Sequence, residues 1–256
     1  MKRVRVVLAA PAAADVEARR DSRDYLHLPL ERSVGAVAPG PAPGRGAVAV
    51  AIDVLRATTS LSVAFSNGAA RVLPAGTVAE GFRLRDQHPG ALLCGEREGK
   101  KVPGFDLGNS PFEYSREVVA GRTLLFASTN GSQALRHAVG ADRRLLAAFV
   151  NVTATAERLA NAEEVWLVAA GKLGRFALED AACAGWLMRS LRARGFDAAG
   201  PGARIAEALA PPDAAAVRAL LEGCSHGRYL RSLGAGFARD VEFCARVDAI
   251  GSAFEV

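Results

Sequence analysis

The sequence has few of the residues on which disulfide frameworks, zinc sites and histidine-based catalysis depend. Only 4 cysteines and 4 histidines occur among its 256 residues. The cysteines are widely spaced and form no C-x-x-C pair, which disfavours both a zinc site and a disulfide scaffold; they are Cys94, Cys183, Cys224 and Cys244. The histidines show no H-x-x-x-H spacing. We therefore expect reduced thiols and a cytoplasmic protein.

Long apolar runs and long basic runs are also missing. No segment approaches the roughly 18 apolar residues that a membrane span needs, so no membrane association is expected. The formal net charge is +5, but the arginines are scattered and no aromatic-rich RNA-binding signature is present, so nucleic acid is not an expected partner. The same positive excess suits a small anionic substrate. The basic start weakly imitates a signal peptide, whereas VRVVLA (4–9) is better explained as a first strand followed by a helix. The oligomeric state is not encoded in any visible pattern, and a homodimer stays open.

The familiar catalytic motifs of α/β enzymes are absent as well. There is no G-x-S-x-G elbow, no Walker P-loop and no G-x-G-x-x-G after a strand. Asp53 is followed by Val54 and Leu55, so the D-x-D arrangement of aspartyl-phosphate enzymes is missing. Cys183 and Arg189 match a C-x5-R spacing, but the residues between them are apolar and helical, whereas a thiolate phosphatase needs a polar loop there. What remains is a reaction with no obvious covalent step.

Short apolar runs alternate with helical patterns along much of the chain. The predicted strands are 4–9, 47–53, 71–75, 91–95, 123–128, 144–150 and 165–171, and helices are predicted at 59–67, 77–86, 111–119, 131–138 and 153–161. Apolar strands separated by helices indicate an α/β fold with mostly parallel sheets flanked by helices. After residue 171 the pattern becomes mainly helical, beginning with 176–195. We predict two α/β lobes with a more helical C-terminal third. As domains, 1–170 is an α/β phosphate-binding lobe, and 171–256 is a mainly helical part packing on it.

Polar and charged side chains follow several of these strands. Ligands of parallel sheets bind beyond the carboxyl ends of the strands, so these residues are the candidates for a site. They are Asp53, Arg56, Thr58 and Thr59 after the strand at 47–53, Glu96 and Arg97 after 91–95, Ser128, Thr129, Asn130, Gly131 and Ser132 after 123–128, and Lys172, Arg175, Glu179 and Asp180 after 165–171. Asn109 joins them from the Gly- and Pro-rich loop at 102–114, whose alternative is a long turn pinned by side-chain hydrogen bonds.

Each residue type has a chemical use and a structural alternative. The S-T-N-G-S turn at 128–132 leads into a helix, so its N–H groups and hydroxyls can cradle a phosphate, although ordinary helix caps use the same residues. Arginine and lysine neutralise oxyanions, but most single cations are solvated surface charges. Asp53 and Glu96 can hold Mg²⁺, which prefers oxygen ligands, or they form ion pairs with Arg56 or Arg97. Together these residues favour Mg²⁺-assisted attack of water on a phosphate ester.

Six segments in this order resemble the 2-phosphosulfolactate phosphatase family. They are DVLRATTS, GEREGKKVPGFDLGNSP, STNGSQAL, NVTATA, AAGKLGRFALEDAACAG and FARDVEFCARVD, with most of the match at 47–184 and a C-terminal piece at 236–248. The resemblance implies a Mg²⁺-dependent enzyme that hydrolyses 2-phospho-3-sulfolactate to 3-sulfolactate, best known as a step towards coenzyme M. It also implies a two-part α/β fold.

The implied substrate carries a phosphate, a carboxylate and a sulfonate, so we assign the candidate residues to these three groups and to the metal. Under this hypothesis Asp53 and Glu96 hold Mg²⁺, with Glu179 or Asp180 as helpers. The turn at 128–132 and Arg56 hold the phosphate, next to Thr58 and Thr59. The carboxylate and sulfonate fall to Arg97, Lys172 and Arg175, with Asn109 in the wall of the site. Asp240 is either a general base or a capping residue.

Two other classes of function stay open. A lyase or transferase could use the same anion site with Mg²⁺ polarising a carboxylate, and metal-dependent release of phosphate would separate it from a phosphatase. A non-catalytic protein could bind a phosphorylated or sulfonated metabolite and leave it intact, and a phosphatase could act on another small phosphorylated hydroxy acid. Carboxylates at strand ends favour catalysis, because an anion binder gains nothing from acids beside its ligand unless a metal offsets them.

Overall fold

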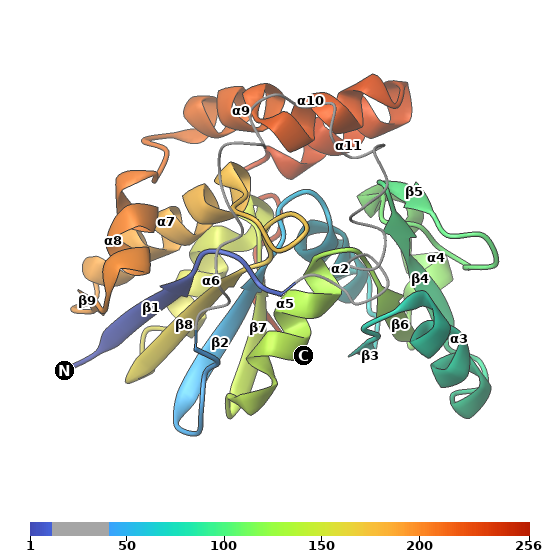
Figure 1. The fold of residues 1–256 in the computed structure, drawn as a ribbon, viewed down its shortest axis with the longest axis horizontal. Helices are drawn as coiled ribbons and strands as arrows, with labels where there is room; N and C mark the ends of the chain where they lie inside the picture. Colours follow the sequence, from blue (N-terminus) through green and yellow to red (C-terminus); the bar gives the residue numbers. More distant parts are fainter. Residues whose placement is uncertain (12–40) are drawn as a thin grey trace.

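The strands form two separate sheets, both mostly parallel (Figure 1). The computed structural model describes residues 1–11 and 41–256, so the helix expected after the first strand lies outside the described residues. The larger sheet has the order β10-β7-β2-β8-β1-β9, and the smaller has the order β3-β6-β4-β5. Within the described residues only the β10–β7 and β4–β5 pairs are antiparallel. The predicted α/β class with mostly parallel sheets is confirmed.

The observed elements follow the predicted ones closely along the chain. The strands are β1 (Arg3–Val7), β2 (Ala47–Ile52), β3 (Arg71–Pro74), β4 (Leu92–Arg97), β5 (Lys100–Lys101), β6 (Thr123–Ala127), β7 (Arg143–Ala147), β8 (Glu164–Ala169), β9 (Asp197–Ala198) and β10 (Phe254–Glu255). The helices are α2 (Ala57–Ser66), α3 (Val78–Gln87), α4 (Arg116–Val119), α5 (Gly131–His137), α6 (Val152–Arg158), α7 (Leu178–Arg192), α8 (Pro201–Ala208), α9 (Ala214–Gly223), α10 (Ser225–Ser232) and α11 (Ala235–Cys244). None of the described helices is long and apolar enough to cross a membrane.

The helix predicted over 111–119 is divided into two short pieces. Ser110 caps a 3₁₀ turn, η2 (Pro111–Glu113), and forms an S-x-x-E capping box with Glu113. Tyr114 and Ser115 then leave the helical conformation before α4 begins. The carboxylate of Glu113 also accepts a hydrogen bond from Gly108 N at 2.7 Å. It therefore ties the turn back to the preceding loop.

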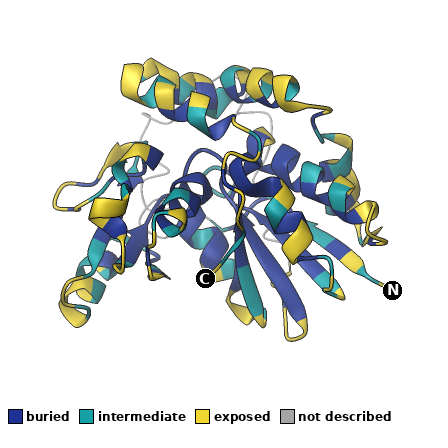
Figure 2. Cartoon of the chain, turned by 180° about the vertical axis from the view of Figure 1, so that it is seen from behind, coloured by how far each residue is buried: buried dark blue, intermediate teal, exposed yellow. Residues whose placement is uncertain are grey.

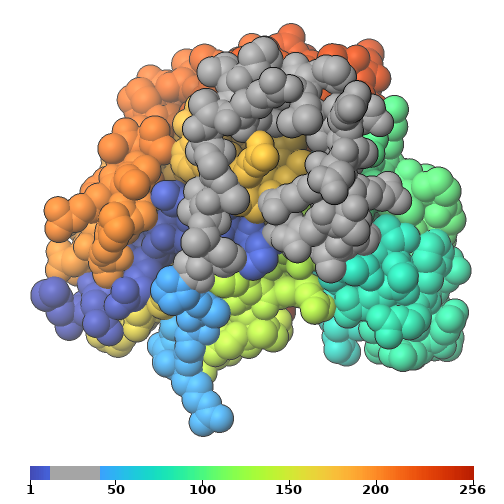
Figure 3. Space-filling view, in the orientation of Figure 1, coloured from blue at the N-terminus to red at the C-terminus, as the bar shows by residue number. Residues whose placement is uncertain are grey.

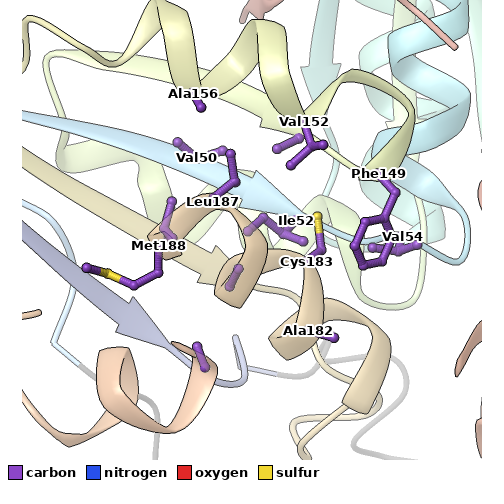
Figure 4. Close-up of a cluster of buried hydrophobic side chains, with 14 of the residues drawn as sticks. Val50, Ile52, Val54, Phe149, Val152, Ala156, Ala182, Cys183, Leu187 and Met188 are labelled. Carbon is purple, nitrogen blue, oxygen red and sulfur yellow. The ribbon is translucent and has the colours of Figure 1, made fainter. Parts of the chain in front are cut away.

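The central strand β2 is buried along its whole length and faces a different layer on each side. Its alternate residues Val48, Val50 and Ile52 belong to a core built with α6, α7 and α8, and Figure 4 shows part of this cluster. The alanines between them face α2, α5 and the smaller sheet. Because alanine side chains are small, α2, α5 and the smaller sheet can pack closely against this face of β2.

The smaller sheet forms a lobe of its own beside the larger one. In the space-filling view, the residues coloured for roughly 70 to 110 stand out at the right (Figure 3). A local core of Leu93, Phe105 and Leu125 fills the face that α3 covers. The opposite face of the smaller sheet contributes Cys94, Leu124 and Phe126 to the hydrophobic core that contains the alanines of β2. The two sheets therefore pack against one common hydrophobic core, but no described strand of one sheet is hydrogen-bonded to a strand of the other.

The C-terminal third is mainly helical and covers one end of both sheets. In Figure 1, α9, α10 and α11 lie across the top, above the carboxyl ends of β2, β8 and β4. Figure 2 shows their outer faces exposed and the strands beneath them buried. The same third also returns β9 and β10 to the edges of the larger sheet. The domain boundary at residue 170 stays a prediction.

Candidate active site

The carboxyl ends of four strands lie beneath α10 and α11 (Figure 1). They are β2 and β8 of the larger sheet and β4 and β6 of the smaller one. Hydrogen bonds tie the segments that follow them to one another. Thr129 N, after β6, donates to Glu96 Oε1 at the end of β4, at 2.8 Å. Leu173 N, after β8, donates to Asn130 Oδ1 at 2.8 Å. The structure thus brings together the segments that carry most of the candidate residues.

Asp53 lies at the end of the central strand and is buried. Its Oδ1 accepts a long hydrogen bond from Ala57 N at 3.4 Å. On its other side is Gly131, where an added Cβ would lie only 2.7 Å from Asp53 Oδ2 and 2.4 Å from the Cβ of Ala57. Burial, followed by the negative charge of Glu96, raises the pKa of Asp53 to about 7. The fold therefore holds a poorly compensated carboxylate against the start of α5.

Asp180 joins the turns that follow β2 and β8. Its Oδ1 accepts from Val54 N at 2.9 Å and its Oδ2 accepts from Gly171 N at 3.0 Å. Burial, and then the charges of Asp53 and Glu179, raise the pKa of Asp180 well above its usual value. Both carboxylate oxygens are thus used to hold two strand ends in place.

Glu179, one residue earlier on α7, has a different partner. His226 Nδ1 lies 3.1 Å from Glu179 Oε1, and both side chains are nearly buried. Burial acts to raise the pKa of Glu179, but the hydrogen bond and charge of His226 lower it overall. The pKa of Glu179 is therefore lowered, whereas the pKa values of Asp53 and Asp180 are raised.

Glu96 accepts two backbone hydrogen bonds at the end of β4. Its Oε2 accepts from Gly99 N at 2.8 Å, within the turn to β5, and its Oε1 accepts from Thr129 N. The partner expected in the ion-pair alternative, Arg97, instead donates to the carbonyls of Glu96 and Ala127 at 2.7 and 3.1 Å. The Glu96 carboxylate is thus oriented by N–H groups.

Arg56 is buried and spans three segments. Its guanidinium donates to the carboxylate of Asp240 on α11 and to the carbonyl of Gly99, and it lies 5.1 Å from the centre of the Phe237 ring. Asp240 also accepts from Ser110 Oγ at 2.6 Å. Burial raises the pKa of Asp240 even though Ser110 and Arg56 oppose that rise. The peptide bond between Leu55 and Arg56 is cis.

The hydroxyls after β2 turn towards the protein's own backbone. Thr58 Oγ1 accepts from Asp53 N at 2.9 Å and lies 2.7 Å from the carbonyl of Ala147. Thr59 donates to the carbonyl of Val54 at 2.9 Å, and Ser60 donates to that of Asn109 at 2.8 Å. These contacts join β2, β7 and the 102–110 loop. A direct role of Thr58 and Thr59 in substrate binding stays a prediction.

Local hydrogen bonds between side chains and backbone hold the turn at 128–132. Ser128 Oγ accepts from Ser132 N at 3.0 Å, and Ser132 Oγ donates to the carbonyl of Ser128 at 2.8 Å. Both serine hydroxyls are thus engaged within the turn, while Asn130 at the N-cap position of α5 makes no side-chain capping bond. Gly131 supplies close approach to Asp53, and Asn130 supplies the link to Leu173. The phosphate-binding role of the turn stays a prediction that rests on its N–H groups.

The chemistry of the donors fits Mg²⁺. Among the described residues no cluster of three or more His, Cys, Asp or Glu side chains is arranged to hold a metal. Mg²⁺, however, commonly takes one or two carboxylates and keeps several waters. Asp53 and Glu96 supply that number, and the buried Asn109 Oδ1 has no hydrogen-bond partner among residues 1–11 and 41–256. An unpaired buried oxygen and an excess of carboxylate charge are what a hydrated cation would compensate.

Several residues at this edge escaped the sequence analysis. Gly99, Ser110 and His226 all contact candidate residues. Ser110 is part of the capping box, but its contact with Asp240 crosses 130 residues. His226 is a lone histidine in no motif. For it the sequence offers no signal at all.

Comparison with known proteins identifies relatives that match most of the chain. Residues 40–255 match the family model described as 2-phosphosulpholactate phosphatase. Proteins named probable 2-phosphosulfolactate phosphatase include one from Thermotoga petrophila, 41% identical over 200 residues, which are 78% of this chain and 85% of the relative. The one from Carboxydothermus hydrogenoformans is 40% identical, with 78% and 82% covered, and the one from Symbiobacterium thermophilum is 39% identical, with 80% and 89% covered. The chain therefore belongs to the 2-phosphosulpholactate phosphatase family.

Proposed function

We propose that this protein is a Mg²⁺-dependent phosphatase that hydrolyses 2-phospho-3-sulfolactate to 3-sulfolactate and inorganic phosphate. Family membership supports the reaction class and the substrate. The observation that carries the proposal within the structure is the position of Asp53. It is a buried carboxylate at the end of the central strand, packed against the first residue of a helix, with Glu96 as a second carboxylate close enough to raise its pKa.

Asp53 and Glu96 are the residues that would hold Mg²⁺. When bound, the ion supplies positive charge to a phosphoryl oxygen and orients an attacking water. Glu179 and Asp180 lie close enough to Asp53 for their charges to interact, and Asp180 fixes the two turns by accepting from Val54 N and Gly171 N. In this proposal Glu179 and Asp180 hold the residues of the site in position and do not contact the substrate.

The phosphate is assigned to the N–H groups of Asn130 and Gly131, where α5 begins, because those of Thr129 and Ser132 already donate to Glu96 and Ser128. Backbone N–H groups at a helix start favour an anion, and Gly131 lets the backbone approach closely. Arg56 acts here by holding the turn after β2 against α11 through Asp240. Asp240 in turn orients Arg56, a role that is neither the general base nor the helix cap that the sequence left open.

The other charged groups of the substrate are assigned to Arg97, Lys172 and Arg175. Lys172 and Arg175 occupy a tight turn in which each residue's N–H donates to the other's carbonyl, at 2.9 and 3.0 Å. Asn130 fixes that turn through Leu173 N. The segment that binds phosphate and the segment that carries these cations are therefore coupled.

The proposal extends to a cytoplasmic location and to a pathway. All four cysteines are buried free thiols, which supports a cytoplasmic enzyme. In the role that the family resemblance implies, release of 3-sulfolactate would be a step towards coenzyme M.

The test is release of inorganic phosphate from racemic 2-phosphosulfolactate, with Mg²⁺ and with EDTA. Phosphoglycolate, phosphoglycerate and phospholactate serve as matched esters. We expect release that requires Mg²⁺ and is fastest with phosphosulfolactate. Release from another ester alone would reject the substrate. Absence of release from every ester, with ligand-induced thermal stabilisation, would reject the enzyme in favour of a binding protein.

A further inference from the structure

The outer face of α11 carries exposed charges of both signs. Arg239 and Glu242 lie on this helix and Arg246 follows it closely, and all three are exposed. None of them forms an ion pair within residues 1–11 and 41–256. Other exposed arginines do have partners, as Arg192 has in Glu207 at 2.7 Å. Figure 2 shows the outer faces of the cover helices open to solvent. The charges on this face are therefore available to a partner.

Aromatic rings hold the two arginines against the surface. Arg239 Cζ lies 3.7 Å from the centre of the Phe112 ring on η2, and Arg246 Cζ lies 5.4 Å from that of Phe243 on α11. The two rings meet edge to face at 5.4 Å. Phe112 is 41% exposed, more than any other aromatic side chain of the described residues. A guanidinium stacked on a ring keeps its N–H edge open to a carboxylate. Phenylalanine and arginine are also the residue types that protein interfaces favour.

The spacing of the exposed residues places them on one line along the helix. Ala235, Arg239 and Glu242 follow one another at intervals of four and three, and Arg246 continues the line just after α11 ends. Intervals of four and three put side chains on the same side of a helix, and they are the spacing with which two helices pack. The buried Asp240 lies on the opposite side, towards the site. The outer side of α11 thus has the pattern of a helix that packs against another helix.

This line is complementary to itself. When two copies of α11 lie antiparallel around a two-fold axis, every residue i that meets residue j is matched by j meeting i. An axis between positions 239 and 242 sets Arg239 of each copy against Glu242 of the other. The same register sets the small Ala235 against the long side chain of Arg246. Both acid–base pairs form at once, and no like charges are opposed.

We propose that the outer face of α11, with Phe112 beside it, is the interface between two copies of this chain. Two pairs of Arg239 with Glu242 cross this interface, and Phe112 supplies apolar contact. Asp240 on the inner side of the same helix holds the turn after β2, so association fixes the cover above both sites. The inference does not depend on the reaction that the site performs.

The test is sedimentation equilibrium of the full chain and of charge-reversed variants. The wild-type protein should have the mass of two chains. Arg239→Glu and Glu242→Arg each oppose like charges at two places, so each should weaken association about tenfold or more. One variant then carries two acids at these positions and the other carries two bases. An equal mixture of the two should therefore form a heterodimer, and the double variant should associate as the wild type does.

Arg218→Glu is the matched control, because it reverses an exposed arginine on α9 and should leave the dimer intact. Circular dichroism and urea unfolding establish that each variant is folded. A wild-type protein that is monomeric at about 100 μM would overturn the proposal, and so would a mixture that forms no heterodimer. Monomeric protein that binds oligoglutamate, and loses that binding with Arg239→Glu, would assign this face to an acidic partner protein and reject the second copy.

Discussion

The guanidinium of Arg56 is paired with the carboxylate of Asp240 although the two residues are 184 positions apart in the chain. Each side chain is 3% exposed. Arg56 follows the central strand by a few residues, and Asp240 lies on α11, so the pair fastens the helical cover to the turn that presents Asp53. Because Arg56 also donates to Gly99, the same contact reaches the turn that orients Glu96.

Removing one member of this pair should be costly. Asp240→Asn leaves Arg56 buried without a counter-charge, and we expect a loss of about 3–5 kcal/mol in the free energy of unfolding. The double variant Arg56→Met, Asp240→Leu should lose less than the sum of the single variants, since no charge stays buried. Urea unfolding at equilibrium measures both. A change below about 0.5 kcal/mol for Asp240→Asn would show that the pair does not hold the cover.

Asp53 and Glu96 should be essential for turnover and dispensable for folding. Asp53→Asn and Glu96→Gln remove the charges proposed to hold Mg²⁺, so kcat should fall about a thousandfold or more. The circular dichroism spectrum and the unfolding transition should persist, because the amides keep the size of the acids. Wild-type rates in both variants would refute the metal assignment.

The raised pKa of Asp53 predicts pH-dependent metal binding. A carboxylate with a pKa of about 7 is mostly protonated at pH 6 and mostly ionised at pH 8, and a metal ligand must be ionised. The apparent affinity for Mg²⁺ should therefore rise with pH, by about tenfold between pH 6 and pH 8. Calorimetric titration of the metal-free protein measures this. A flat profile, or an affinity that falls as pH rises, would contradict the account.

Gly131 should tolerate no side chain. Gly131→Ala places a Cβ 2.4 Å from that of Ala57 and 2.7 Å from Asp53 Oδ2, so either the backbone or the carboxylate must move. We expect a loss of about 1–3 kcal/mol in stability and a marked loss of turnover. Gly236→Ala is the matched control, because it lies in α11 with no atom within 4 Å of the added Cβ. It should be neutral or stabilising. If the two variants have similar stability and turnover, close packing of Gly131 against Asp53 is not required for either property.

Much of this architecture can be predicted from local patterns. Apolar runs such as AVAVAI locate the strands, and the rule that ligands bind at strand ends selects Asp53, Glu96 and the turns at 128–132 and 172–175. Those segments do meet in the structure. The capping box at Ser110 is of the same local kind, since its S-x-x-E signature occupies four consecutive residues.

Long-range pairing explains what could not be predicted. The division into two sheets depends on which strands pair, and β9 and β10 have two residues each, too few to show a period. The hydroxyls of Thr58 and Ser60 reach the carbonyls of Ala147 and Asn109, 89 and 49 positions away. The role of His226 likewise depends on a contact across 47 residues. Such partners are fixed by tertiary packing alone.

The most direct test of the central claim is to follow the oxygen atoms of the reaction. Phosphorus NMR of the wild-type protein with Mg²⁺ and 2-phosphosulfolactate, in water enriched in oxygen-18, reports which bond breaks. Attack of water on phosphorus, as proposed, places one labelled oxygen in each phosphate released and leaves 3-sulfolactate unlabelled. Unlabelled phosphate would mean that the carbon–oxygen bond breaks instead, and it would contradict a phosphatase at this site.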